Sequence, residues 1–421
     1  MTSLPSAAST ELSRKARLVV LLAAFAGLLF DGWELGLMPV ASLSVTHSLL
    51  GEAYTDALAG DWFARFTASL MLGAAVGGIV FGALGDRIGR TRAMGVSILF
   101  YSVFAGAGLF VQSLEQMLAL RFLVGLGVGG MWPNGVALVS ECWPNVSRPV
   151  VAGIVGAGLN AGILLLSQIA RLWHITPESW RWLFGWSAVP GLLGVAALLF
   201  VPESPIWLAS RNTIVKVSAP VRELLRPPLL RLTLLGIMLG SIPMIGAWAS
   251  SKWMIPWADK IGGTAQPDYK AVTQGFWALG AVLGSFFGAQ LASLLGRRVT
   301  YFLISLGSTV LTCGIFTMTA PLQPGFLPMV FVQGFVATLF FGWLPLYLPE
   351  LFPTRVRATG SGISYNVGRF ATAVGVFIAG TLMTWFGGDY SKVGAVTGLI
   401  YAFGMIAIWF APDTSHKTME D

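Results

Sequence analysis

The sequence predicts an all-α polytopic membrane protein, with twelve transmembrane helices in two pseudo-symmetric six-helix bundles. Hydrophobic residues make up 55% of the 421 residues and charged residues only 11%, which is far from the composition of soluble domains. The apolar residues form continuous runs rather than alternating ones, which excludes a β-barrel. A basic motif, GDRIGR at 85–90, returns in weaker form as ASLLGRR at 292–298. This recurrence indicates a duplicated chain.

Twelve apolar runs are long enough to cross a bilayer, because a spanning helix needs about 20 residues. They lie at 17–45, 62–85, 92–112, 116–140, 148–170, 181–200, 228–256, 271–294, 298–318, 326–348, 356–385 and 393–411. The polar start of the chain leads straight into a full-length span, so no cleavable signal peptide is expected.

The chain divides between the sixth and seventh runs, where a stretch rich in Pro, Ser and Arg predicts a linker. The expected domains are a cytoplasmic tail at 1–16, an N-terminal bundle at 17–200, a cytoplasmic linker at 201–227, a C-terminal bundle at 228–411 and a second cytoplasmic tail at 412–421.

The basic residues predict which side of each span faces the cytoplasm. Most of the 26 Lys and Arg residues fall in the tails, the linker and every second break, such as 87–92 and 297–298. The breaks between them hold acids such as Glu52, Asp56 and Asp61. The positive-inside rule therefore places both termini in the cytoplasm of a multi-pass protein in a plasma or bacterial inner membrane. A nucleic-acid surface is disfavoured, because the charges are spread over many breaks rather than gathered on one polar domain.

Four motifs carry a resemblance to a known group of proteins. They are GDRIGR at 85–90, RFLVGLGVGG at 121–130, PESPIWL at 202–208 and PELFPTRVRATGSG at 349–362. Together they resemble the major facilitator superfamily over nearly the whole chain. The resemblance implies the major facilitator fold and transport by alternating access, with substrate held near the bilayer midplane between the halves.

Two further motifs narrow the resemblance. DGWE at 31–34 and GGMWPNGVALVSE at 129–141 are similar to the aromatic acid/proton symporter family. The PELFPTRVRATG segment is also similar to sugar porters, synaptic vesicle glycoproteins and animal organic ion transporters. The chain is thus most like the aromatic acid/proton symporter and organic anion transporter branches.

Charged residues next to the motifs predict a cytoplasmic gate beneath each bundle, which the resemblance implies is broken in the inward-open state. Its expected members are Gly85, Asp86, Arg87, Arg90, Glu141, Arg148, Glu203, Arg297, Arg298, Glu350, Arg355 and Arg357. Because Ser293 and Leu294 replace the acidic and first basic positions in the second copy, the second gate is expected to be weaker. An alternative is that these charges only flank helices and fix topology.

Ionisable residues inside spans are costly and therefore default to functional candidates. Asp31 and Glu34 lie three residues apart in the first run, Arg121 opens the fourth, Lys252 lies late in the seventh and Arg369 lies well inside the eleventh. The resemblance implies a proton-coupling pair of Asp31 with Arg121, so Asp31, Glu34 and Arg121 are assigned to proton coupling. A static ion pair is the alternative.

Arg369 indicates the charge of the substrate. It follows RATG at 357–360, where both aromatic-acid symporters and organic anion transporters tend to keep an arginine. A guanidinium facing a cavity can bind a carboxylate with two hydrogen bonds, although it can instead bond backbone carbonyls or a neighbouring acid. The other expected substrate-binding residues are Tyr365, Asn366, Trp132, Asn134, Asn160, Gln168, Trp343 and Tyr347. Trp33, Trp248 and Trp277 are further aromatic residues of the spans that suit a cavity lining.

The sequence therefore predicts proton-coupled symport of an organic anion, such as an aromatic or other carboxylic acid. Two alternatives stay open: the same fold carrying sugars, sugar acids or organic cations, or working without protons, and a membrane receptor that transports nothing. An enzyme is disfavoured because no nucleophile with a base, metal cluster or nucleotide loop is present. No metal and no cofactor are expected. The expected partners are the organic anion, a proton and the lipid bilayer, with no nucleic acid, and a monomer is expected.

Overall fold

The computed structural model describes residues 12–143, 148–210, 220–353 and 356–414, and helices are the regular structure in this part of the chain. The first half holds α1 (Arg14–Leu50), η1 (Gly51–Ala53), α2 (Asp56–Ile88), α3 (Arg90–Ala107), η2 (Gly108–Phe110), α4 (Leu114–Cys142), α5 (Arg148–Leu172), α6 (Arg181–Trp186) and α7 (Pro190–Phe200). Two short helices follow, α8 (Pro205–Ser210) and α9 (Pro220–Leu224). The second half holds α10 (Leu229–Ile245), the π-helix η3 (Gly246–Ser250), η4 (Ser251–Trp253), α11 (Met254–Gly262), α12 (Tyr269–Ser285), α13 (Gly288–Leu295), α14 (Arg297–Met318), α15 (Phe326–Glu350), α16 (Arg357–Trp385), α17 (Tyr390–Gly398), α18 (Ile400–Ala407) and η6 (Ile408–Phe410).

The number of spans agrees with the sequence. Among the described residues, ten helices are long and apolar enough to cross a membrane, and α12 and α13 supply an eleventh span that is bent by 46°. Helix α5, with 25 residues, occupies the place of the remaining predicted span. The helices run beyond several apolar runs because polar caps continue them into the loops: the Thr55 hydroxyl accepts from the backbone of Leu58 and begins α2 six residues before the predicted start of the second run.

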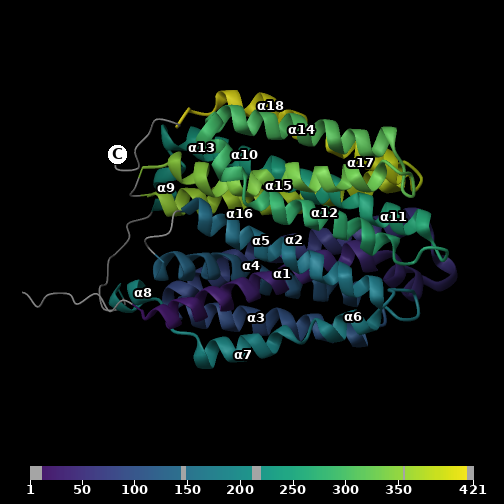
Figure 1. Ribbon diagram of the computed structural model, residues 1–421, viewed down its shortest axis with the longest axis horizontal. Helices are drawn as coiled ribbons and strands as arrows, with labels where there is room; N and C mark the ends of the chain where they lie inside the picture. Colours follow the sequence, from purple (N-terminus) through teal and green to yellow (C-terminus); the bar gives the residue numbers. More distant parts are fainter. Residues whose placement is uncertain (1–11, 144–147, 211–219, 354–355, 415–421) are drawn as a thin grey trace, which may run out of the picture.

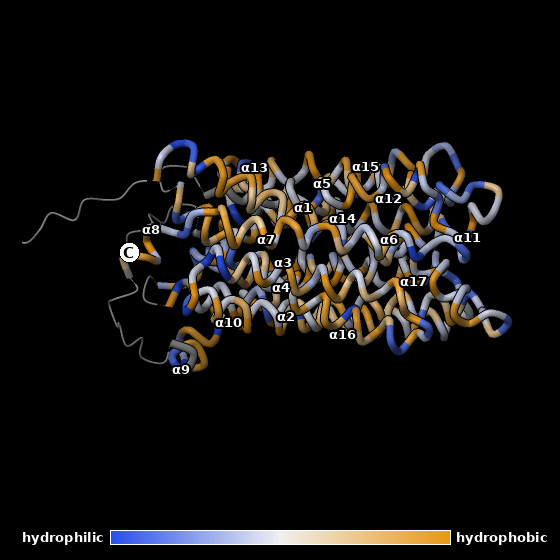
Figure 2. The backbone as a smooth tube through the Cα atoms, turned by 90° about the horizontal axis from the view of Figure 1, so that it is seen from below, coloured by the Kyte–Doolittle hydropathy of each residue, from blue (hydrophilic) through white to orange (hydrophobic). Residues whose placement is uncertain are grey.

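The long helices lie side by side in two layers, with α1 to α7 in one layer and α10 to α18 in the other (Figure 1). We call the end where α8 and α9 lie the linker end, and the end where α6 and α11 lie the far end. Hydrophilic segments gather at these two ends, and the hydrophobic segments lie between them (Figure 2). This distribution is the one expected of a chain whose middle is covered by lipid.

The two halves contact each other mainly through α2 against α16 and α5 against α12. At the far end, one hydrophobic cluster includes residues of both halves, such as Phe63 of α2, Trp253 of η4 and Met383 of α16. A second cluster belongs almost wholly to the first half and a third wholly to the second half. Among the described residues, the hydrophobic core that the two halves share most extensively therefore lies at the far end.

The duplicated motif is visible in the backbone. Gly89 joins α2 to α3 with a φ of 111°, and Gly296 joins α13 to α14 with a φ of 84°. Both values lie in a region that side chains with a Cβ rarely adopt, so each turn requires glycine. The repeat thus keeps its turn where Ser293 and Leu294 have replaced the charged positions of the first copy.

Candidate substrate site

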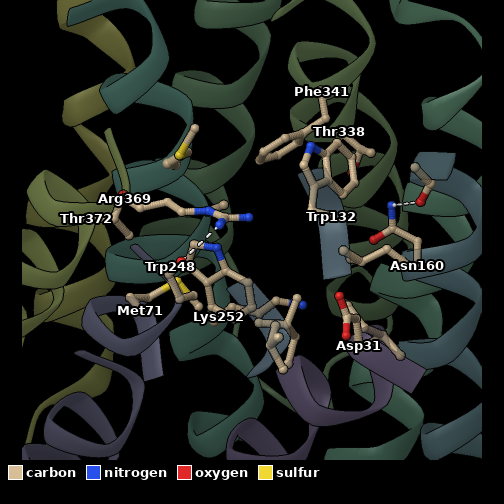
Figure 3. Close-up of a pocket in the computed structure, with 18 of the residues that line it drawn as sticks. Asp31, Met71, Trp132, Asn160, Trp248, Lys252, Thr338, Phe341, Arg369 and Thr372 are labelled. Carbon is tan, nitrogen blue, oxygen red and sulfur yellow. Dashed lines mark hydrogen bonds between the residues drawn. The ribbon is translucent and has the colours of Figure 1, made fainter. Parts of the chain in front are cut away.

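A cavity lies between the two halves, walled by α1, α2, α4 and α5 on one side and by the α10 to η4 segment, α12, α15 and α16 on the other (Figure 3). Its polar and aromatic lining consists of Asp31, Trp132, Asn160, Trp248, Lys252, Trp277, Thr338, Phe341, Tyr365, Arg369 and Thr372. The cavity therefore combines three side chains that are ordinarily charged, Asp31, Lys252 and Arg369, with walls of aromatic rings.

Arg369 reaches the cavity from α16 and touches the opposite half. Its Nη1 donates to the backbone oxygen of Ala74 on α2 at 3.1 Å. One turn earlier on α16, Tyr365 lies with its ring 5.2 Å from the guanidinium carbon and stacks on Trp132 of α4, with ring centroids 6.3 Å apart. Arg369 thus bonds a backbone carbonyl, as the alternative reading expected, and also faces the cavity.

The buried acids of α1 have different surroundings. Arg121 Nη1 lies 3.2 Å from Glu34 Oε2, and both side chains are fully buried inside the first half. The resemblance implied a pair of Asp31 with Arg121, and this pairing is wrong in the structure: Asp31 lines the cavity instead. The reason is helical geometry, because side chains three residues apart diverge by about 60° around the axis.

Four of the nine expected substrate-binding residues line the cavity, namely Arg369, Tyr365, Trp132 and Asn160. The Asn160 amide also donates to Ser285 on α12, which joins the halves. The other five do not line it and are corrections to the sequence prediction: Asn134, Gln168, Trp343, Tyr347 and Asn366.

The five excluded side chains are bonded elsewhere. Asn134 donates to the backbone oxygens of Phe81 and Gly130, and Asn366 to that of Gly362. Gln168 accepts from Arg171, Trp343 donates to the oxygen of Arg297, and Tyr347 donates to that of Pro412. The bonds of Asn366 and Gln168 lie within their own helices, and the others join neighbouring segments.

Lys252 is a site residue that the sequence flagged as a buried charge but did not assign. Its side chain is 1% exposed, and its Nζ lies 3.2 Å from the ring centroid of Trp277 and 5.7 Å from that of Trp248. The seventh apolar run seemed to end at 256, which put Lys252 near the membrane surface. The span continues through Gly262, so Lys252 lies at the depth of the cavity.

Beneath the first half, three of the expected gate residues, Asp86, Arg90 and Glu141, form a connected set of ion pairs. Asp86 and Arg90 form an ion pair, and Arg90 Nε also lies 3.4 Å from Glu141. Glu203 accepts from the backbone nitrogen of Thr91 at 3.0 Å, at the start of α3. Gly85 packs against Asn134, whereas Arg87 is exposed.

Beneath the second half, Arg297 donates two hydrogen bonds to Glu350, at 3.0 and 2.8 Å. Arg298 donates to the backbone oxygen of Ala411 and Arg357 to that of Phe352. The second pair is more buried and better bonded than Arg90 with Glu141. The expectation that the second gate is weaker stays a prediction. Arg355 and the side chain of Arg148 lie outside the described residues.

The architecture is that of a membrane transporter: two helical halves related by a repeat enclose a charged cavity at the depth of the membrane. A family model described as "Sugar (and other) transporter" matches residues 19–219 and 218–421. Over 410 residues the chain is 29% identical to the cis,cis-muconate transport protein of Acinetobacter baylyi, with 96% of both chains covered. Over 353 residues it is 31% identical to a probable 4-methylmuconolactone transporter of Cupriavidus pinatubonensis, with 82% of this chain and 81% of the relative covered.

Among solved structures, the partially occluded inward-open conformation of the xylose transporter XylE from E. coli matches with a TM-score of 0.74 and 17% identity, covering 96% of this chain and 100% of that one. At this identity the likeness shows the fold alone. The chain belongs to the sugar (and other) transporter family within the major facilitator superfamily. It is a multi-pass membrane transporter and not an enzyme, and the predicted fold class is confirmed.

Proposed function

We propose that this chain carries an organic carboxylate together with a proton by alternating access, as a monomer with both termini in the cytoplasm. The observation that carries the proposal is that Arg369 and Asp31 face the same cavity, from opposite halves of the molecule. The names of the two relatives above, which concern muconate and a muconolactone, support an organic acid as the substrate.

Arg369 is the proposed anchor for the carboxylate. A guanidinium has five N–H donors, and the bond from Nη1 to Ala74 uses one of them. The remaining donors can bind a carboxylate through two parallel hydrogen bonds. The rings of Trp132, Tyr365 and Trp277 give the cavity flat apolar walls, which suit a planar substrate.

Asp31 is the proposed proton carrier. Glu34 already has Arg121 as a buried partner, whereas Asp31 Oδ1 has no hydrogen-bond partner among the described residues. The ionisable groups around Asp31 are Arg369 on α16, Lys252 on η4, Glu34 on its own helix and Tyr101 on α3. A carboxyl group at a cavity wall can exchange its proton with cavity water. The negative charge of its deprotonated form then interacts with Arg369, the proposed anchor for the substrate.

The gates fit alternating access if the linker end is cytoplasmic, as the positive-inside rule predicts. The outside is then closed by the hydrophobic cluster that the two halves share, and the structure is inward-facing. Within each half, the charges at the linker end are bonded to one another rather than across the halves. In an outward-facing state these same groups are available for contacts between the halves.

A thermal-shift screen of the purified protein tests the substrate class. Aromatic and aliphatic acids, sugars and amines are screened on wild type and on Arg369→Ala, with Arg65→Ala as a surface control that removes an exposed arginine paired with Asp61. Carboxylates that stabilise wild type and the control but not Arg369→Ala support the proposal. Sugars or amines that stabilise all three proteins, with no effect of any acid, contradict it.

Proteoliposomes test the proton. We expect Asp31→Asn to keep exchange of substrate across the membrane and to lose accumulation driven by a pH gradient. Glu34→Gln is compared in parallel, because it alters the buried pair with Arg121 rather than the cavity wall. If Asp31→Asn still accumulates substrate in response to a pH gradient, Asp31 is not the coupling group.

A further inference from the structure

Lys252 gives the cavity a second positive charge that the carboxylate anchor does not use. It projects from η4, in the only span of the described chain where a π-helix and a 3₁₀-helix interrupt the α-helix in succession. Such interruptions inside a membrane are tolerated where the backbone lines a cavity, and π-helical segments are frequent at functional sites. The irregular segment therefore places Lys252 at the cavity wall.

The ammonium of Lys252 has no hydrogen-bond or ion-pair partner among the described residues, although its side chain is 99% buried. Its contact is the face of the Trp277 ring, 3.2 Å from Nζ to the centroid. A cation–π contact offsets only part of the cost of taking an ammonium out of water. The ammonium is thus left without a bonded counter-ion among the described residues.

The Trp277 ring is itself fixed in place. Its Nε1 donates to Gln333 Oε1 at 2.8 Å, and Gln333 Nε2 donates to Ser251 and to Thr312. Ser251 is the neighbour of Lys252 in η4. This network holds the ring and the backbone beside the ammonium, so Lys252 is oriented before any ligand arrives.

The charges in the cavity indicate whether the substrate carries one carboxylate or two. Arg369 and Lys252 are the two basic side chains of its lining and Asp31 is the acidic one. When Asp31 carries a proton, the two basic groups face the cavity without an opposing charge. A monocarboxylate neutralises one of them and a dicarboxylate neutralises both.

We propose that the transported anion is a dicarboxylate, with one carboxylate on Arg369 and the other on Lys252. This inference rests on the proposed function, since it takes Arg369 as the first anchor. It assigns Lys252 as the residue that distinguishes dianions from monoanions of the same shape.

Matched pairs of ligands test this assignment on the purified full-length protein by isothermal titration calorimetry. The probes are cis,cis-muconate with its monomethyl ester and terephthalate with its monomethyl ester, which share a skeleton and differ by one charge. The proteins are wild type, Lys252→Met, Lys252→Arg and Lys392→Met, the last removing an exposed lysine whose side chain is 64% accessible. Size-exclusion profiles establish that each variant is folded.

We expect wild type and Lys392→Met to bind at least one dianion more tightly than its ester. Lys252→Met should weaken the binding of that dianion by about 10- to 100-fold and leave the affinity for the ester nearly unchanged. Lys252→Arg should keep most of the preference for the dianion. If wild type shows no preference for the dianion, or if the preference survives in Lys252→Met, the inference is overturned. Binding of the ester still tests the role of Arg369 as the first anchor. If no carboxylate in these pairs or in the acid screen binds wild type, the proposed function fails and the inference with it.

Discussion

Two polar contacts join the halves at the far end, a buried hydrogen bond and an exposed ion pair, and we expect the first to contribute more to its closure. Lys270 Nζ donates to Ser44 Oγ across the two halves at 3.1 Å, and Lys270 is 3% exposed. Lys260 Nζ lies 2.9 Å from Asp56 Oδ2, also across the halves, but these side chains are 32% and 43% exposed. We predict that Ser44→Ala opens the far end more readily than Asp56→Asn does.

The expected magnitudes follow from burial. A hydrogen bond to a charged group contributes about 1.5–3 kcal/mol, so Ser44→Ala should shift the ratio of open to closed far ends by about 10- to 150-fold. Ser44 also donates to the backbone oxygen of Ile175. Because that bond lies within one half, Ser44→Ala removes it from both the open and the closed conformation, and the loss does not change their ratio. An exposed ion pair contributes about 0.2–1 kcal/mol, so Asp56→Asn should shift the ratio by no more than about 5-fold.

Electron paramagnetic resonance distances measure this opening. Spin labels at Glu52 and Gln266 sit at the far end on different halves, and both positions are exposed. We expect the population at long distance to increase strongly in Ser44→Ala and weakly in Asp56→Asn. Ser69→Ala is the matched control, because its hydroxyl donates to Leu118 within the first half only.

Two results would refute this reasoning. Equal shifts in Ser44→Ala and Asp56→Asn would mean that burial does not determine which contact holds the far end. No shift in either variant would mean that the shared hydrophobic cluster closes this end without help from polar contacts.

Three other predictions concern stability. Glu203→Ala removes the acceptor of the Thr91 backbone nitrogen at the start of α3 and should lower stability by about 0.5–2 kcal/mol, seen as a lower thermal midpoint; an unchanged midpoint would contradict the cap. Gly162→Ala places a Cβ 1.7 Å from the backbone oxygen of Leu29, whereas Gly153→Ala meets its nearest atoms at 3.4 Å, so the first should lose folded protein in size-exclusion chromatography and the second should not. Glu350→Ala leaves the partly buried Arg297 without its bidentate partner and should cost up to about 3–5 kcal/mol, against about 1 kcal/mol or less for Asp86→Asn in a more exposed pair; a thermal comparison with the opposite order would reject this ranking.

The spans could be predicted because the membrane imposes length and hydropathy on every one of them. Their ends could not, because caps such as Thr55 continue a helix beyond the apolar run. The bend between α12 and α13 was not predicted either, although Gly284, Ser285 and Gly288 lie at it. The division at the linker and the orientation of the termini stay predictions.

The charged members of the site could be identified from the sequence, whereas the polar and aromatic candidates divided: Trp132, Asn160 and Tyr365 line the cavity, and Asn134, Gln168, Trp343, Tyr347 and Asn366 do not. A charge inside a span is rare enough to stand out, as Asp31 and Arg369 did. A tryptophan or asparagine in a span is equally consistent with packing, and only the rotation of its helix decides. Trp343 and Tyr347 lie four residues apart on one face of α15, and their rings stack with centroids 4.4 Å apart. Both side chains donate to backbone oxygens away from the cavity.

The contacts of Arg369 suggest how substrate binding acts on the movement of the halves. A ligand shifts a conformational equilibrium only through contacts that differ between the two states. In this conformation Arg369 donates to Ala74 across the halves, and the backbone of Gly78 on α2 passes so close that a Cβ there would lie 3.3 Å from Arg369 Nη1. When the halves separate along α2 and α16, this donor is released and becomes available to a carboxylate. The side chain proposed to anchor the carboxylate is therefore also a contact between the two halves.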